Sequence, residues 1–197
     1  QPIYEGLRAG DEGGVGLITY MRTDSTRVAH SAITEAREFI SSKYGAQFVP
    51  PHARSFIRSV KGAQEAHEAI RPTKIGREPS LIKPYLTNAQ FRLYELIWKR
   101  MVASQMSAAL FDNTTVDIKA RCPVSRVEYL FRTSSSVSIF PGFTILYTES
   151  KDEAERESRK DSPLPYLERG DLLRIVWLFP EQHFTQPPPR FTEATLI

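Results

Sequence analysis

The hydrophobic pattern of this chain changes its period near residue 110, and this change limits the fold more than any other feature. Before that point, apolar residues recur at helical spacing, as in segments 28–44 and 87–105. After it, β-branched and aromatic residues alternate with polar residues in short runs. Helices have a period of about 3.6 residues and half-buried strands a period of about two. The pattern predicts an α+β protein, with a helical domain over residues 1–110 and an antiparallel β domain over residues 111–197.

Two helices have recognisable ends in the sequence. The first is expected over Val28–Tyr44, with Ser25 or Thr26 as its N-cap and Gly45 just beyond its end. The second follows Thr87–Gln90, which has the spacing of a capping box. One side of this second helix carries mostly apolar side chains: Phe91, Tyr94, Ile97, Trp98, Met101, Val102 and Gln105. Both segments are therefore expected to bury one face in a core.

The remaining elements are shorter. A strand or extended lead-in is predicted for Leu17–Tyr20, and a short helix for Gln64–Ile70, which must end before Pro72 because the residue preceding proline disfavours helical angles. Lys151–Asp161 is expected to be a solvated loop and Pro187–Pro189 a stiff connector. The predicted strands of the second half are Thr115–Arg121, Val124–Thr133, Ser136–Phe140, Thr144–Thr148 and Leu172–Phe179.

Composition excludes several classes of protein. No apolar run approaches the roughly 18 residues that a membrane-spanning helix needs, and no signal peptide is recognisable. Cys122 is the only cysteine and cannot form an internal disulfide, which is typical of a reducing compartment. Residues 1–110 hold 15 Lys and Arg against 10 Asp and Glu, whereas residues 111–197 hold 11 against 13. These features predict a cytoplasmic protein without a membrane partner, whose basic half contacts a polyanion.

The common catalytic motifs are absent from the sequence. His67-Glu68-Ala69-Ile70-Arg71 begins like a zinc-binding H-E-x-x-H helix, but Arg71 stands where the second histidine must be. There is no G-x-S-x-G turn, no G-x-x-x-x-G-K loop and no D-x-D pair of carboxylates. The sequence therefore predicts no metal site within this chain.

Two ordered strings remain, and each is ordinary when its residues are considered singly. Tyr20, Arg22, Asp24 and Ser25 form the first string, and each has a common structural role as a packed aromatic, a surface ion pair or a helix cap. The second string is centred on His67 and contains Gln64, His67, Glu68 and Arg71. Only the strings as wholes are informative.

As wholes, they resemble the motifs of one enzyme family. LITYMRTDST resembles the active-site tyrosine motif of type IA DNA topoisomerases, and QEAHEAIRPT resembles a second motif of the same enzymes. HFTQPPPRFTEATLI is similar to the segment by which their β domain leads back to the rest of the enzyme. Met21 is typical of the bacterial topoisomerase I branch, because the topoisomerase III branch usually carries proline there. The resemblance implies a helical tyrosine domain followed by part of the β arch that forms the gate.

The resemblance also implies a mechanism. Tyr20 would cut one DNA strand by transesterification through a 5′-phosphotyrosine intermediate, without ATP. A phenol has a pKa of about 10 in water, so cationic partners are needed, and Arg22 and His67 are the expected catalytic partners. Arg22 would lie on the same face of an extended segment as Tyr20. Asp24 would orient Arg22. The residues expected at the DNA are Arg22, Gln64, His67, Glu68, Arg71 and Thr73.

The chain departs from the family in one respect. The family's magnesium is bound by carboxylates of a Toprim domain, which this sequence lacks, so the chain is expected to be a fragment that binds no cofactor and is inactive alone. Its expected partners are single-stranded or negatively supercoiled DNA in the bacterial nucleoid and the remaining domains of the same polypeptide. Two alternatives stay open: a topoisomerase III-type decatenase fragment, and a non-catalytic DNA-binding module in which Tyr20 stacks on bases.

Overall fold

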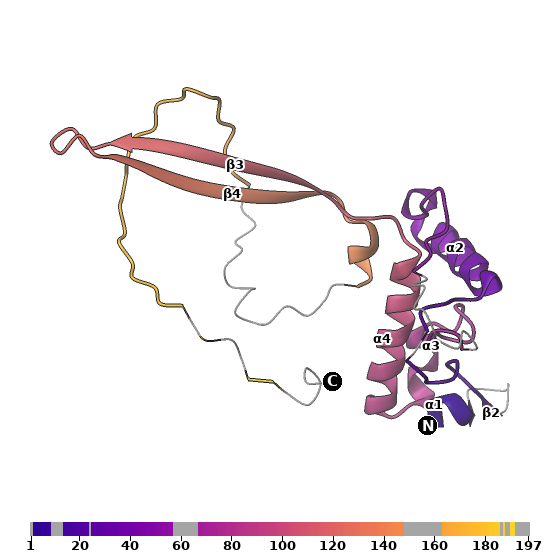
Figure 1. Ribbon diagram of the computed structural model, residues 1–197. Helices are drawn as coiled ribbons and strands as arrows, with labels where there is room; N and C mark the ends of the chain where they lie inside the picture. The colour runs from indigo at the N-terminus through magenta and orange to yellow at the C-terminus, as the bar shows by residue number, and fades with distance from the viewer. Residues whose placement is uncertain are drawn as a thin grey trace, which may run out of the picture. The chain divides into compact units, whose positions relative to one another are not determined.

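The computed structural model describes residues 2–8, 14–23, 25–56, 67–147, 163–185, 187 and 190–191. The chain divides into two units, Gln1–Leu164 and Pro165–Ile197. All helices and strands of the described residues lie in the first unit (Figure 1). In chain order they are α1 (Pro2–Glu5), β1 (Leu7–Arg8), β2 (Gly14–Val15), α2 (His30–Tyr44), η2 (Ala46–Phe48), α3 (Pro79–Ile82), η3 (Lys83–Tyr85), α4 (Asn88–Ser104), β3 (Leu110–Arg121), β4 (Glu128–Phe140) and η4 (Gly142–Ile145). The predicted α+β class is confirmed, and the change from helix to strand falls between α4 and β3.

Helices α2 and α4 form the centre of the core. The Phe39 ring of α2 meets the Trp98 ring of α4 edge to face, with 5.6 Å between the ring centroids. Trp98 Nε1 donates to the carbonyl of Ile75 at 2.8 Å, and Tyr94 Oη donates to the carbonyl of Arg77 at 2.7 Å. Each aromatic body is thus buried while its polar tip is satisfied by the turn before α3. The buried helix residues are Ala32, Ala36, Ile40, Tyr94, Trp98, Met101, Val102 and Ala103.

Two of the three helix ends that the sequence predicts are found in the structure. The capping box before α4 is confirmed, with Thr87 and Gln90 each bonding the backbone N–H of the other. Gly45, at a φ of 103°, ends α2 as expected. The N-cap prediction for α2 was wrong, because the helix begins only at His30. Ser25 Oγ accepts from Arg27 N, and Thr26 Oγ1 donates to the Phe56 carbonyl, so neither hydroxyl is available to a helix.

The segment before Tyr20 is an extended lead-in held by one antiparallel bridge, Ile18 to Pro72. The predicted short helix over Gln64–Ile70 is wrong for the residues that the structure describes, His67–Ile70, which are not helical. Gln64 and its two successors lie outside the described residues. The Ala69 N–H donates to Arg27 O at 2.7 Å, so this peptide group bonds a segment distant in sequence instead of the next helical turn.

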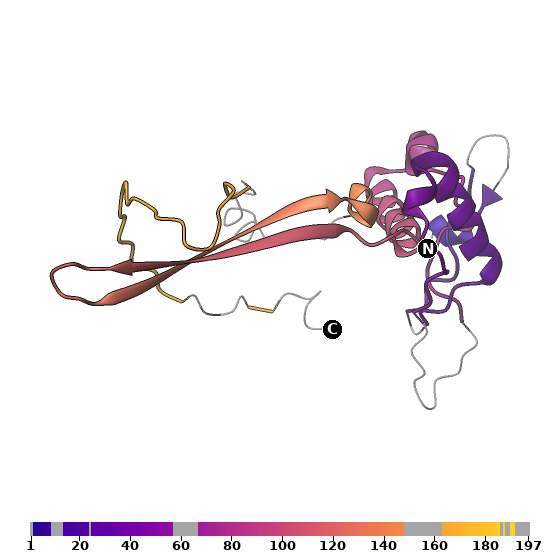
Figure 2. The same cartoon turned by 90° about the horizontal axis from the view of Figure 1, so that it is seen from above.

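Strands β3 and β4 form a two-stranded antiparallel sheet and run side by side in both views (Figures 1 and 2). The predicted runs Val124–Thr133 and Ser136–Phe140 merge into β4, with Val124 left in the turn. The face of the hairpin that carries Asp117 is mostly polar, with Arg132 bound to Asp117 through two hydrogen bonds of 2.6 and 2.9 Å. Residues Val116, Ile118 and Phe131 share the other face, as strand alternation requires.

Two predicted strands of the second half are wrong. Thr144–Thr148 is replaced by η4 as far as Ile145, because the chain turns at Gly142 and Phe143 N donates to Ser107 O. Thr148 and the predicted loop Lys151–Asp161 lie outside the described residues, as do Pro188 and Pro189 of the connector. Leu172–Phe179 forms no strand, and its apolar side chains are 51–100% exposed. A strand needs a partner for its backbone groups, and no described residue supplies one.

Gly142 gives the first stability prediction. Its φ is 50°, and a Cβ there would lie 2.5 Å from both the carbonyl oxygen of Ala108 and the amide nitrogen of Ala109. Gly142→Ala should therefore destabilise the chain by about 2 kcal/mol or more, through strain and overlap with backbone that cannot move aside. Urea unfolding followed by circular dichroism measures this. Gly76→Ala is the control, because its Cβ would meet nothing within 4 Å. Equal midpoints for the two variants would contradict the prediction.

Candidate active site

Tyr20 lies at the end of the extended lead-in, and its side chain is 51% exposed. Two rings orient it. Tyr4 of α1 packs edge to face against it at 5.5 Å between ring centroids, and His67 lies at 6.0 Å with an interplanar angle of 33°. The phenol is thus held on one side by aromatic contacts and open to solvent on the other. Such a side chain can be approached by a large substrate without unfolding.

The structure brings together residues that are far apart in sequence. His67 is half-buried and lies beside Tyr20, as the two motifs require if they form one site. Arg22 is exposed, two residues beyond Tyr20. Asp24 and Gln64 lie outside the described residues, so their predicted roles stay predictions. A phenol and an imidazole therefore lie side by side, and an exposed guanidinium follows the phenol two residues later in the chain.

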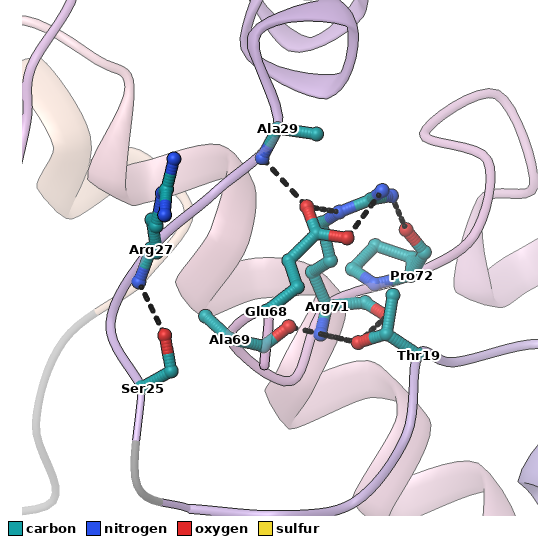
Figure 3. A network of polar contacts seen from close by, with 8 residues as sticks. All are labelled: Thr19, Ser25, Arg27, Ala29, Glu68, Ala69, Arg71 and Pro72. Carbon is teal, nitrogen blue, oxygen red and sulfur yellow. Dashed lines mark hydrogen bonds and ion pairs between the residues drawn. The ribbon is translucent and has the colours of Figure 1, made fainter. Parts of the chain in front are cut away.

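Glu68 and Arg71 form the polar centre of the segment that follows His67 (Figure 3). Arg71 Nε donates to Glu68 Oε1 at 2.7 Å and Arg71 Nη2 to Glu68 Oε2 at 3.1 Å, a forked ion pair. Glu68 Oε1 also accepts the N–H of Ala29 at 2.6 Å, and Arg71 Nη1 donates to the carbonyl of Pro72 at 2.9 Å. These contacts join the histidine segment to the residue that precedes α2.

Two threonines join the same segment to the tyrosine lead-in. Thr19 Oγ1 donates to Ala69 O at 2.8 Å and accepts from Arg71 N at 3.0 Å, as Figure 3 shows. Thr73 Oγ1 donates to Gly16 O at 2.8 Å. Glu68, Arg71 and Thr73 thus make specific bonds inside the protein, and their contact with DNA stays a prediction. Thr19 was not identified from the sequence, although its place immediately before Tyr20 was a usable signal. Tyr4 had no such signal.

The Glu68 carboxylate allows a prediction about pH. Burial by itself would raise the pKa of Glu68, but the hydrogen bonds from Arg71 and from Ala29 N–H, with the Arg71 charge, together hold the pKa below its ordinary 4.5. A lowered pKa means that the stabilisation is complete above the unfolded value and is lost as pH falls through the folded one. Glu68→Gln should therefore be less stable than the wild-type chain at pH 7, and the gap should shrink as pH falls below about 4.5.

Urea unfolding midpoints at a series of pH values from neutral into this acid range test the Glu68 prediction. Glu95→Gln is the matched control, because Glu95 is exposed to nearly the same extent as Glu68 and forms a partly exposed i,i+4 pair with Lys99 on α4. Such pairs contribute about 0–1 kcal/mol, so this variant should stay close to wild type throughout. If the difference in stability between wild type and Glu68→Gln stayed constant with pH, the folded protein would not stabilise the ionised form of Glu68, and the prediction would be wrong.

Magnesium, which the family resemblance implies, does not fit the residues that the structure describes. No group of three or more His, Cys, Asp or Glu side chains in this part of the chain could hold a metal ion. The carboxylate of Glu68 is engaged by Arg71 and Ala29. No step of the chemistry is therefore assigned to a metal here. Among the same described residues, no helix is long and apolar enough to cross a membrane.

Comparison with known proteins identifies the family. The family of DNA topoisomerases matches the whole chain, residues 1–197. The chain therefore belongs to the DNA topoisomerase family. It is 45% identical over 201 aligned residues to DNA topoisomerase 1 of two strains of Xylella fastidiosa, covering 100% of this chain and 24% of each relative.

A solved structure agrees with this assignment. Full-length topoisomerase I from Thermotoga maritima matches with a TM-score of 0.63 and 33% identity, over 85% of this chain and 24% of that one. These relatives are topoisomerase I proteins, so neither the topoisomerase III alternative nor the non-catalytic module is favoured. This chain spans about a quarter of the length of the relatives that it matches.

Proposed function

We propose that this chain carries the strand-cleaving tyrosine of a type IA DNA topoisomerase I. The Tyr20 oxygen attacks a backbone phosphorus and gives up its proton, while the bond from that phosphorus to the 3′ oxygen of the neighbouring sugar breaks and this oxygen takes up a proton. The products are a 5′-phosphotyrosine link and a free 3′-hydroxyl. Attack by that hydroxyl on the same phosphorus reverses both changes, so no ATP is consumed. Between the two steps another strand can pass, which relaxes negative supercoils.

The observation that carries this proposal is the placement of Tyr20 against His67. The phenol is half exposed, so a DNA phosphate can reach it, and the imidazole lies on its protein side. Besides the nucleophile, phosphoryl transfer requires fixed positive charge near the phosphate oxygens, where it stabilises the transition state. We assign that role to Arg22, whose planar fork suits two phosphate oxygens, and to His67. Tyr4 holds the ring of the nucleophile without taking part.

DNA is the proposed substrate, single-stranded or negatively supercoiled. The contacts that we propose lie along Arg22, Gln64, His67, Glu68, Arg71 and Thr73, all in the basic half of the chain. Phosphate contacts of this kind bind without reading sequence. We propose that Glu68 acts there through its pair with Arg71 rather than by touching the negatively charged DNA. The bacterial nucleoid, in the cytoplasm, is where this substrate occurs.

We further propose that magnesium and the rest of the active site come from domains outside this chain. Two observations support this: the chain spans 24% of its relatives, and its described residues offer no metal site. The isolated chain should then leave supercoiled plasmid unchanged, and relaxation should require the remaining domains and magnesium. Magnesium-dependent relaxation by these 197 residues alone would overturn this part of the proposal.

The decisive experiment is to locate the DNA-linked residue. The full-length polypeptide is incubated with a single-stranded oligonucleotide and magnesium, denatured and digested with protease. Mass spectrometry of the nucleotide-linked peptide should place the phosphate on Tyr20. A link to any other residue, or binding of DNA with no link under conditions that cleave DNA with the Thermotoga maritima relative, would contradict the proposed function.

A further inference from the structure

The loop that carries Tyr20 is closed at both ends by the backbone groups of one residue, Ala69. On the entry side, Thr19 Oγ1 donates to the carbonyl of Ala69 at 2.8 Å. On the exit side, the N–H of Ala69 donates to the carbonyl of Arg27 at 2.7 Å. The loop from Tyr20 to Thr26 therefore leaves and returns at the same residue of the histidine segment. His67 lies two residues before that residue.

The entry side of this closure depends on one side chain. Thr19 N donates to Arg71 O at 2.9 Å, and Arg71 N donates back to Thr19 Oγ1 at 3.0 Å. The hydroxyl thus donates to one backbone group and accepts from another, a combination that only serine or threonine provides in so small a volume. The exit side is backbone to backbone and is compatible with any side chain at position 69 except proline, which has no N–H. The distance between the tyrosine and histidine segments therefore depends on the identity of the side chain at position 19.

We propose that Thr19 is a positioning residue for strand cleavage, which sets the separation of the Tyr20 phenol and the His67 imidazole. The inference rests on the proposed function, because it concerns the rate of the Tyr20 reaction. Thr19 does not touch the reacting atoms and acts through its hydrogen bonds to Ala69 and Arg71. A displacement of about 1 Å in an active site can lower a rate on the order of a hundredfold, whereas DNA binding through distributed phosphate contacts tolerates it.

Three variants of the full-length polypeptide test this. Thr19→Val keeps the shape and β-branching but removes the hydroxyl, and Thr19→Ser keeps the hydroxyl. Thr144→Val is the matched control, since Thr144 is also half-buried and its hydroxyl donates to a backbone carbonyl, that of Pro141, at 2.6 Å. The readouts are the single-turnover rate of covalent adduct formation at saturating single-stranded oligonucleotide, the Kd for the same oligonucleotide, and the urea midpoint.

Thr19→Val should form the adduct at least about tenfold more slowly with a Kd within about twofold of wild type, and Thr19→Ser should return to within about threefold. Thr144→Val should lose a similar amount of stability and keep the wild-type rate. If Thr19→Val matches Thr144→Val in rate, or if Thr19→Ser is as slow as Thr19→Val, the inference is wrong. If Thr19→Val does not fold, the inference is tested by the adduct rates of Thr19→Ser and Thr19→Asn instead. Thr19→Asn keeps a donor and an acceptor but places them on a larger side chain, so its rate should fall. A normal rate for Thr19→Asn would overturn the inference. Wild-type protein that forms no adduct would instead refute the proposed function.

Discussion

Replacement of Tyr20 by phenylalanine in the full-length polypeptide should abolish the covalent protein–DNA adduct while leaving the fold and DNA affinity intact. The substitution removes one oxygen and keeps the ring that packs against Tyr4 and His67. The side chain is half exposed, so no core packing depends on the lost atom. Because the oxygen is the atom that bonds to phosphorus, no partial activity should remain.

The Tyr20 measurement uses an oligonucleotide labelled at its 3′ end, since the 5′-phosphotyrosine link retains the 3′-terminal fragment on the protein. A denaturing gel then shows a labelled protein band for wild type and none for Tyr20→Phe. Tyr85→Phe is the control, because Tyr85 of η3 is similarly exposed, at 48%. A labelled band in Tyr20→Phe would mean that another residue is the nucleophile. Loss of the folded state in Tyr20→Phe would instead make Tyr20 a structural aromatic.

Arg22→Ala should leave the nucleophile in place yet lower both cleavage and religation by about a hundredfold or more, the effect of removing one charge-assisted phosphate contact from a transition state. Arg22→Lys should recover only part of this loss, because an ammonium is a point charge and cannot bond two phosphate oxygens in one plane. Both steps pass through the same transition state, so both should change by the same factor. The equilibrium fraction of adduct should stay nearly constant.

Rates of cleavage and of salt-induced religation, measured separately on the 3′-labelled substrate, test the Arg22 prediction. Arg92→Ala removes an exposed arginine from α4 and controls for the general loss of positive charge. A similar decrease in Arg92→Ala would assign the effect to long-range attraction of DNA. A loss of affinity with normal rates at saturation would assign Arg22 to binding alone.

The sequence predicted those parts of the fold that depend on neighbours in the chain. The capping box of Thr87 and Gln90 lies within four residues, and α4 starts where it indicates. Glycine at position 45 ends α2 for an equally local reason. By contrast, Leu172–Phe179 has the composition of a strand but no partner among the described residues. Alternation of apolar and polar residues indicates a preference for extended backbone. Whether a strand forms depends on backbone hydrogen bonds to a partner strand, which can be distant in sequence.

The proximity of the two motifs at the candidate site was predictable to a similar extent. Tyr20 and His67 were identified as one site from two motifs, and the structure places their rings side by side. The form of the histidine segment was not predictable, because Ala69 and Arg71 bond residues about 50 positions away instead of forming a helical turn. Thr19 was missed for the same reason. Its place beside Tyr20 is a local signal that it lies near the site, but no local signal shows that its hydroxyl bonds across the fold.

The long sequence separation of these hydrogen bonds also has a consequence for the order in which the chain acquires structure. The hairpin β3–β4 closes around a short turn, and such hairpins form in roughly 1–10 µs. The hydrogen bonds from Thr19 to Ala69 and Arg71 form only when the ends of a loop of about 50 residues have come together. They should therefore form more slowly than the hairpin. On the ribosome, Tyr20 emerges well before His67. In an incomplete or partly folded chain Tyr20 is therefore exposed without His67 beside it, and the site proposed for strand cleavage is complete only in the finished fold.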